Sequence, residues 1–270
     1  MTFALRLYCD FIVFAFGAVA GSFFNVCIHR MPREESIVNP PSHCPKCNQR
    51  IRWRDNIPLV SWLVLRGKCR HCGALISPRY IFIELLTASL FLAVWLKYEL
   101  SVFAFIYWIL VGGLIVATFI DFEHYIIPDE ITYGGIVVGI IASILFPPLH
   151  DAPTIWRSLV SSVVGGFTGG ATLLLVALVG EKIFKKEAMG MGDVKFIAAM
   201  GAFLGWQAVF FIIFASSLVG GIVGVALVLG DKKGWGSRLP YGPYLAFGAL
   251  LWVFVGQSFM NWYIARYFSY

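Results

Sequence analysis

Charged side chains are scarce in this chain. Of its 270 residues, 13% are Asp, Glu, Lys or Arg and 59% are hydrophobic, and the mean hydropathy is +0.78. Soluble domains carry about 25% charged residues. Because so few polar side chains cannot cover a globule that faces water, the composition excludes an ordinary soluble protein. It predicts a protein that is solvated by lipid.

Long apolar runs occupy most of the chain. A helix that crosses a bilayer needs about 20 apolar residues. The runs lie at 11–28, 81–97, 101–120, 131–148, 158–180, 194–204, 207–229 and 243–264. We therefore predict an all-α polytopic membrane protein with about eight transmembrane helices. The run 194–204 is too short to cross alone, so seven spans plus a half-helix is the alternative.

The basic residues are placed unevenly between the runs. If the segment after the first span is cytoplasmic, alternation puts residues 29–80, 121–130, 181–193 and 230–242 on the same side of the membrane. In or beside these segments lie 17 of the 21 Lys and Arg residues. Lys and Arg are enriched in cytoplasmic loops, so we expect these segments to be cytoplasmic. Topology accounts for the positive charge, and nucleic acid is not an expected partner.

Cysteine is rare, but four of the six cysteines form two Cys-x-x-Cys pairs, Cys44 with Cys47 and Cys69 with Cys72. Zinc prefers four soft ligands in a tetrahedron, and this spacing is typical of four-thiolate zinc sites. Two disulfides are the alternative, but they require an oxidising compartment. We predict a structural zinc site. The neighbouring histidines, and Cys9 and Cys27 near the first span, are expected to have no ligand role.

Two acidic residues lie at the membrane edge, where charge is costly and marks candidate functional sites. Asp121 ends the third run, and Asp193 follows Gly190 and Gly192 in a Gly-x-Gly-Asp motif. Aspartyl proteolysis needs two carboxyl groups that share a proton. The same depth for both acids therefore favours a catalytic pair. In the alternative interpretation, Asp193 is a helix N-cap and Asp121 marks the interface.

Several ordered motifs resemble the type IV prepilin peptidases of bacterial pilus and type II secretion systems, which are also called leader peptidase and N-methyltransferase. The resemblance covers nearly the whole chain and is carried by residues 21–30, the two cysteine pairs, 52–62, 76–80 with Glu84, 121–129, 190–193 with Lys195, and 240–246.

The resemblance implies an activity and a location. It implies cleavage of a prepilin or pseudopilin leader after Gly by Asp121 and Asp193, supported by Pro128, Asp129 and the motif glycines. Methylation of the new N-terminal residue by S-adenosylmethionine would follow. The expected setting is the bacterial inner membrane, with the lipid bilayer as partner and the active site at the cytoplasmic face.

A Gly-rich nucleotide loop of the Rossmann type is absent, so no motif places the methyl donor. Gly67, Lys68 and Glu84 are weak candidates. The expected division of the chain is 1–28 as first span, 29–80 as zinc-binding and methyltransferase loop, and 81–270 as peptidase core. A zinc-stabilised scaffold without catalysis and a peptidase without methylation remain alternatives.

Overall fold

The computed structural model describes residues 2–185, 189–230 and 239–267, which are mostly helical and contain no strand. The chain forms two compact units, Met1–Val116 and Ala117–Tyr270. The sequence instead predicted functional boundaries after residues 28 and 80. The structural units differ because the helices on both sides of the loop pack together in unit 1. The functional assignment of the predicted segments stays a prediction.

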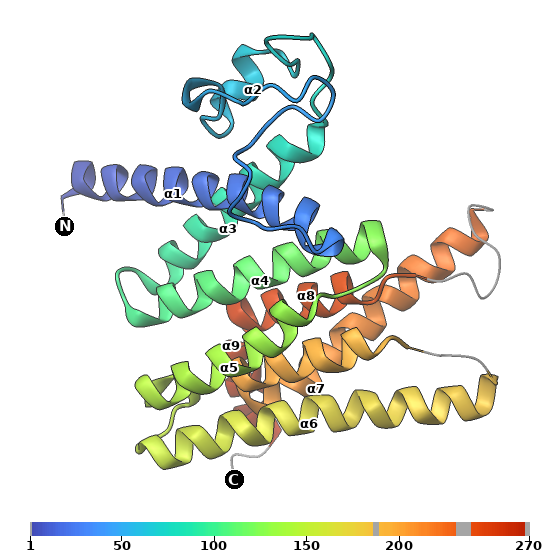
Figure 1. Cartoon of the computed structure of the whole chain (residues 1–270). Coiled ribbons are helices and arrows are strands. Elements are labelled where there is room, and N and C mark those ends of the chain that lie inside the picture. Colours follow the sequence, from blue (N-terminus) through green and yellow to red (C-terminus); the bar gives the residue numbers. More distant parts are fainter. Residues whose placement is uncertain (1, 186–188, 231–238, 268–270) are drawn as a thin grey trace. The chain divides into compact units, whose positions relative to one another are not determined.

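Unit 1 is built on three helical segments: α1 (Phe3–Arg30), α3 (Pro78–Tyr98) and the first part of α4 (Val102–His124) (Figure 1). Two glycines of α1 let its backbone approach α3. A Cβ atom on Gly17 would lie 2.7 Å from the Ala88 Cα, and one on Gly21 would lie 2.8 Å from the Glu84 Cα. Small residues are what permits such close packing between helices in lipid.

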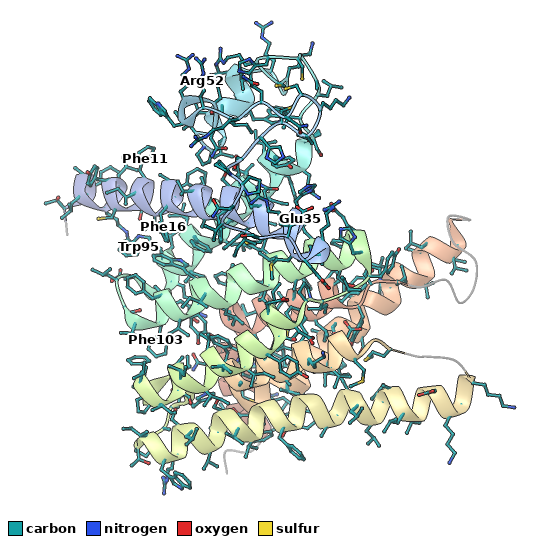
Figure 2. The ribbon with its side chains drawn as sticks, in the orientation of Figure 1. Phe11, Phe16, Glu35, Arg52, Trp95 and Phe103 are labelled. Carbon is teal, nitrogen blue, oxygen red and sulfur yellow. The ribbon has the colours of Figure 1, made fainter. Side chains whose placement is uncertain are left out.

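Aromatic rings fill the space beside this contact. The Phe91 ring stacks on Trp108 with 5.5 Å between centroids. Phe16, on α1 and labelled in Figure 2, lies 6.0 Å from the Phe91 ring and 5.7 Å from the Trp108 ring. Offset aromatic contacts of this kind add to the stabilisation from burial. They join α1, α3 and α4 into one core.

The segment between α1 and α3 has little regular structure: η1 (Met31–Arg33), η2 (Trp53–Asp55) and the short α2 (Val60–Val64). Figure 2 labels Arg52 within it. Two buried charged side chains fasten it to the helices.

Arg30 donates to the carbonyl oxygens of Ser36 at 2.8 Å and Pro40 at 2.7 Å. Glu84 accepts the Leu59 N–H at 2.7 Å. Such charge-assisted hydrogen bonds are stronger than neutral ones. The segment is therefore held near its start by a side chain from α1 and at Leu59 by a side chain from α3.

Unit 2 contains the end of α4 and the later elements, which surround α7 (Figure 1). After α4 come α5 (Asp129–Leu145), η3 (Pro147–His150), α6 (Ile155–Phe184), α7 (Met191–Leu229), α8 (Gly242–Leu251), the π-helical η4 (Trp252–Gly256) and α9 (Gln257–Tyr267). Helix α7 packs mainly against α6, and also against α5 and α8.

Helix α7 consists of two helical arms that meet at Gly205. The backbone there has φ 82° and ψ 171°, which is not helical and favours glycine. A Cβ atom on Gly201 would lie 2.9 Å from a methyl group of Val209, so the arms contact each other across the bend.

Short contacts show that the second arm runs back beside the first. The Ile127 side chain contacts two glycines. It would lie 3.3 Å from a Cβ atom built on Gly192 and 3.0 Å from one built on Gly242. The neighbouring Tyr241 hydroxyl lies 2.7 Å from the Ser216 hydroxyl. A straight helix would separate Gly192 from Ser216 by about 36 Å at 1.5 Å per residue. These contacts cannot span that length, so the chain reverses at Gly205.

The crossing of α6 and α7 depends on glycine. A Cβ atom on Gly165 would overlap the Gly201 carbonyl oxygen, and one on Gly201 would overlap the Gly165 carbonyl oxygen. A Cβ atom on Gly169 would lie 2.8 Å from the Ile197 carbonyl oxygen. The backbones are thus in direct contact over more than one helical turn.

Six helical segments among the described residues are long and apolar enough to cross a membrane: Phe3–Arg33, Pro78–Tyr98, Val102–His124, Ile155–Ile183, Met191–Leu229 and Gly242–Tyr267. Helix α5, with 17 residues, is shorter than this group. The predicted runs 194–204 and 207–229 are the two arms of α7. The all-helical membrane fold is confirmed, whereas the count of eight spans is not.

We expect Gly165→Ala to lower the free energy of unfolding by about 1–3 kcal/mol, because the added methyl group overpacks a backbone contact. Gly134→Ala is the matched control, since a Cβ atom there meets nothing within 4 Å. It should be neutral or stabilise by up to about 1 kcal/mol. Thermal unfolding in detergent, followed by circular dichroism, measures both. Equal melting temperatures for Gly165→Ala and wild type would contradict the packing argument.

Candidate active site and metal centre

Asp121 lies in the last turn of α4 and is 5% exposed. The helix ends just beyond it because Tyr125 adopts φ 56°, and the Tyr125 N–H donates to the Asp121 carbonyl oxygen at 3.0 Å. The Asp121 side chain accepts the Gly242 N–H at Oδ2, with a distance of 2.9 Å. A buried carboxyl group is therefore held in one orientation by a backbone donor.

This donor belongs to the first turn of α8. The first N–H groups of a helix lack partners within the helix, and a carboxylate near them is stabilised by the helix dipole. Asp121 thus ends one helix and caps another. The sequence interpretation missed this contact, because 121 positions separate Asp121 from Gly242. The only feature of the local sequence that indicated this contact was the position of Gly242 between Pro240 and Pro243.

Asp193 lies in the first turn of α7 and is partly buried. Its N–H donates to the Gly190 carbonyl oxygen at 3.2 Å, and the Gly190 backbone hydrogen-bonds to its carboxyl group. The N-cap position of α7 is Gly190. The alternative in which Asp193 is the N-cap residue is therefore wrong, although Asp193 does lie at the helix start.

Ile127 brings the two acids together. It contacts the glycine that precedes Asp193 and the glycine that donates to Asp121, at the distances given above. The carboxyl groups of Asp121 and Asp193 lie close enough to interact electrostatically. A Cβ atom on Gly242 would lie between Asp121 and Ile127, and one on Gly192 would press against Ile127. The structure therefore joins both predicted catalytic residues in unit 2.

Pro128 and Asp129 position the start of α5 beside this pair. Pro128 is the N-cap of α5, and Asp129 forms an ion pair with Lys195, two residues after Asp193. The Lys195 ammonium group also lies 4.9 Å from the centroid of the Tyr133 ring. The Asp129–Lys195 ion pair fastens the first turn of α7 to α5. Lys195 therefore supports the site, and Asp129 has a structural partner.

The four predicted cysteine ligands also meet. The Sγ atoms of Cys44, Cys47, Cys69 and Cys72 all lie within 4.8 Å of one another. The Cys44 and Cys72 Sγ atoms are 3.9 Å apart. Tetrahedral zinc with Zn–S distances of about 2.3 Å requires about 3.8 Å between sulfurs. All six cysteines are free. The cluster could hold one metal ion, and no disulfide joins its cysteines.

The two halves of the cluster have the same turn. The Cys44 N–H donates to Gln49 at 3.0 Å, and the Cys69 N–H donates to Ala74 at 2.8 Å. The residue after each second cysteine is left-handed: Asn48 has φ 55° and Gly73 has φ 68°. The repeated turn points both cysteines of each pair to the same side.

Backbone donors prepare one ligand for metal. Hydrogen bonds from the backbones of Cys72 and His71 lower the pKa of Cys69 to about 7. Metals bind the thiolate form of cysteine. Beside this turn, Arg70 forms a bidentate pair with Asp55 at 2.6–3.0 Å. Its hydrogen bonds lower the pKa of Asp55. This pair connects the second cysteine turn to η2.

The methyl-donor candidates lie in unit 1 but have different environments. Gly67 is buried at φ 65° beneath the Trp62 ring, which lies 3.0 Å from its Cβ position. Lys68 is exposed, and its backbone forms an isolated antiparallel β-bridge with Leu75. Glu84 is buried on α3. No hydrogen bond or ion pair joins these three candidates within the described residues, so they stay a prediction.

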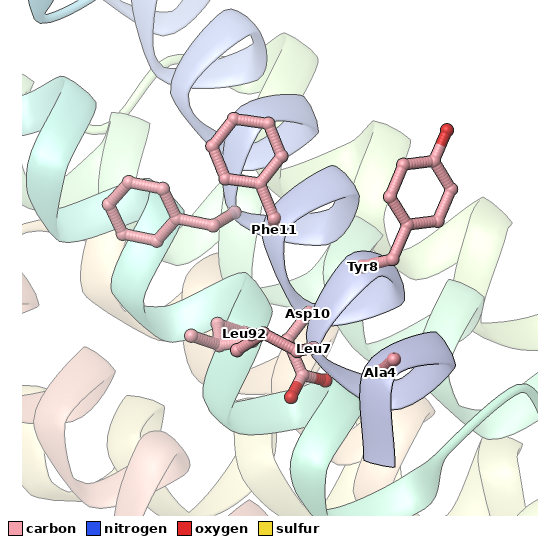
Figure 3. A pocket seen from close by; sticks show the side chains of 7 residues that line it. Ala4, Leu7, Tyr8, Asp10, Phe11 and Leu92 are labelled. Atoms are coloured by element: carbon pink, nitrogen blue, oxygen red, sulfur yellow. The ribbon is translucent and has the colours of Figure 1, made fainter. Parts of the chain in front are cut away.

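A shallow apolar groove on unit 1 contains none of the predicted site residues (Figure 3). It is lined by Ala4, Leu7, Tyr8, Asp10, Phe11, Phe14 and Leu92. Asp10 accepts the Trp95 indole N–H at 2.7 Å. This contact provides a partner for a carboxyl group within the apolar span of α1.

The fold and site define a multi-pass helical membrane protein with paired acids at helix ends and a separate four-cysteine cluster. Residues 15–98 match the family model for the bacterial peptidase A24 N-terminal domain, and residues 108–225 match that for the type IV leader peptidase family. The chain belongs to the type IV leader peptidase family, which confirms the resemblance stated from its motifs.

Curated relatives agree with this assignment over most of the chain. The chain is 36% identical to a prepilin leader peptidase/N-methyltransferase of Aeromonas hydrophila, covering 95% of this chain and 94% of that one. It is 37% identical to a type 4 prepilin-like proteins leader peptide-processing enzyme of Escherichia coli, covering 90% and 93%. A Myxococcus xanthus relative is 39% identical, covering 82% and 64%. No solved structure matches the chain significantly.

We expect purified protein to carry about one zinc ion per chain, since four thiolates complete its tetrahedral shell. Cys69→Ser should lose most of that zinc, because a serine hydroxyl is a poor ligand for it. Cys9→Ser is the matched control, because Cys9 lies on α1 outside the cluster. Mass spectrometry of metal content measures all three. Zinc retained at the wild-type level by Cys69→Ser would refute this ligand set.

Proposed function

We propose that this protein cleaves the leader peptide of type IV prepilins or pseudopilins and methylates the new N-terminal residue. The names of its relatives support both activities. The observation that carries the peptidase proposal is that Ile127 in unit 2 contacts both the glycine before Asp193 and the glycine that donates to Asp121, and that the two acids interact electrostatically. The family model for leader peptidases covers the same part of the chain.

The proposed peptidase step uses the two carboxyl groups as a unit. One group takes a proton from a water molecule as the water attacks the scissile carbonyl, and the other donates a proton to the carbonyl oxygen or leaving amine. The pair shares one proton, so it can play both roles. Gly190 carries no side chain beside the Asp193 carboxyl group, where a peptide backbone could approach. Cleavage after Gly at the cytoplasmic face of the inner membrane completes the proposal.

The proposed methyl transfer belongs to unit 1. S-adenosylmethionine would supply the methyl group to the new terminal amine. The loop 29–80 and α3 carry the candidate donor residues Gly67, Lys68 and Glu84. Zinc held by the four cysteines would fix the loop without taking part in the chemistry, because a closed four-thiolate shell leaves no position for substrate.

We expect Asp121→Asn and Asp193→Asn each to lower prepilin cleavage by at least about 100-fold, since an amide cannot transfer the required proton. Asp151→Asn is the matched control, because Asp151 is an exposed acid at the end of η3 in the same unit. Mass analysis of a co-expressed prepilin measures the leader. Each variant must be found in the membrane fraction.

Two results would overturn this assignment. Full cleavage by both Asn variants would refute the acid pair and favour a different protease in the same cells. An uncleaved prepilin with wild-type protein would favour the metal-stabilised scaffold without catalysis.

We expect Glu84→Gln to lower methylation about tenfold while cleavage continues, because a charged hydrogen bond to the Leu59 N–H is weakened. Glu99→Gln is the matched control, since Glu99 is an exposed acid just after α3. The ratio of methylated to unmethylated mature pilin, read by mass spectrometry, measures the effect. An unchanged ratio would remove Glu84 from the methyl-donor candidates.

A further inference from the structure

We propose that Tyr241 is a positioning residue for the peptidase reaction, and that its hydroxyl contacts hold the Gly242 N–H on Asp121 Oδ2 so that Oδ1 serves the reaction. The inference deepens the proposed function and rests on it. It assigns a role to a residue that lies outside the acid motifs and reaches the reaction through its neighbour.

The Gly242 contact leaves no space for a side chain. A Cβ atom on Gly242 would lie 2.8 Å from Asp121 Oδ2 and 3.0 Å from the end of the Ile127 side chain. Gly242 is buried, and its N–H lies 2.9 Å from the same Oδ2 atom. One carboxyl oxygen of Asp121 is therefore occupied by the backbone.

The first turn of α8 has one N–H group available for this purpose. Pro243 has no N–H. The N–H groups of Tyr244 and Leu245 both donate to the Tyr241 carbonyl oxygen, at 3.0 and 3.2 Å. Gly242 is thus the donor that α8 offers to Asp121, and Tyr241 is the residue around which this turn closes.

Two hydroxyl groups of the second arm of α7 hold the Tyr241 side chain. The Tyr241 hydroxyl lies 2.7 Å from the Ser216 hydroxyl and 3.2 Å from the Ser217 hydroxyl. Ser216 is fully buried, whereas Ser217 is exposed. The network therefore anchors the turn at a depth set by α7.

A count of protons fixes the direction of the network. The Ser216 hydroxyl donates to the Ile213 carbonyl oxygen at 3.0 Å. Because a hydroxyl group has a single proton, Ser216 accepts from Tyr241, and Tyr241 accepts from Ser217. Each hydroxyl proton has a defined acceptor. Removal of the Tyr241 hydroxyl breaks two hydrogen bonds and leaves the buried Ser216 oxygen with one fewer donor.

This arrangement predicts which kinetic constant changes. The network acts on the orientation of a carboxyl group and not on the substrate. Tyr241→Phe keeps the ring and removes only the hydroxyl, so we expect kcat for prepilin cleavage to fall about tenfold while KM stays within about twofold of wild type. Methylation of a pilin supplied already cleaved should be unchanged, because the donor candidates lie in unit 1. That second activity reports on folding.

The matched control is Tyr244→Phe. Tyr244 lies in the same turn, and its ring packs on Gly220, where a Cβ atom would lie 3.3 Å away. Its hydroxyl forms no hydrogen bond in the described part of the chain. We expect this variant to cleave as wild type does.

A double-mutant cycle tests the network itself. The variant with Ser216→Ala and Ser217→Ala should lose as much kcat as Tyr241→Phe, and the combination of all three changes should lose no more than either alone. Residues that act as one unit are non-additive in this way.

The experiment measures kcat and KM with purified full-length enzyme in detergent and a purified prepilin, with methylation of the cleaved pilin assayed in parallel. Wild-type kinetics for Tyr241→Phe, additive losses in the cycle, or equal losses in Tyr241→Phe and Tyr244→Phe would each overturn the inference. A parallel fall in methylation would show general destabilisation and would also overturn it. Cleavage that survives Asp121→Asn would instead refute the proposed function.

Discussion

Asp193 and Ser216 reach the same cluster of residues because the chain reverses at Gly205. The first arm of α7 delivers Asp193 beside Ile127, and the second arm returns to hold the turn before α8, which donates to Asp121. Without a residue that accepts φ 82°, the two arms would continue in one direction. The glycine crossing with α6 then allows the folded helix to pack. The arrangement of Asp121 and Asp193 thus depends on the backbone conformation at Gly205, which is distant from both acids in the sequence.

Much of this arrangement could be predicted from sequence, because its signals are local. Apolar runs predicted the helices, and the Cys-x-x-Cys spacing predicted a cluster that the structure assembles. Asp121 and Asp193 were singled out by their position at the ends of runs. The short run 194–204, with glycine on either side of its end, already indicated that this region differs from an ordinary span. The structure describes it as the first arm of α7.

The missing part consists of contacts between distant segments. Nothing local connects Gly242 with Asp121, Lys195 with Asp129, or Tyr241 with Ser216. These pairs depend on how helices cross, which hydropathy does not specify. The alternative that made Asp193 the N-cap of α7 was also wrong. Asp is a common N-cap residue, and only the backbone angles reveal that Gly190 occupies that position.

The glycine contacts carry a consequence for how tolerance to mutation is interpreted. At Gly165 and Gly201 the obstacle to a side chain is backbone of the facing helix, which cannot rotate away. Deep mutational scanning should therefore find these positions as intolerant as the acids, although they touch no reacting atom. Intolerance alone would mark the α6–α7 crossing as part of an active site. Separating the two groups of positions requires a measurement of protein abundance beside that of cleavage. Substitutions at the crossing lower both abundance and cleavage, whereas substitutions at the acids lower only cleavage.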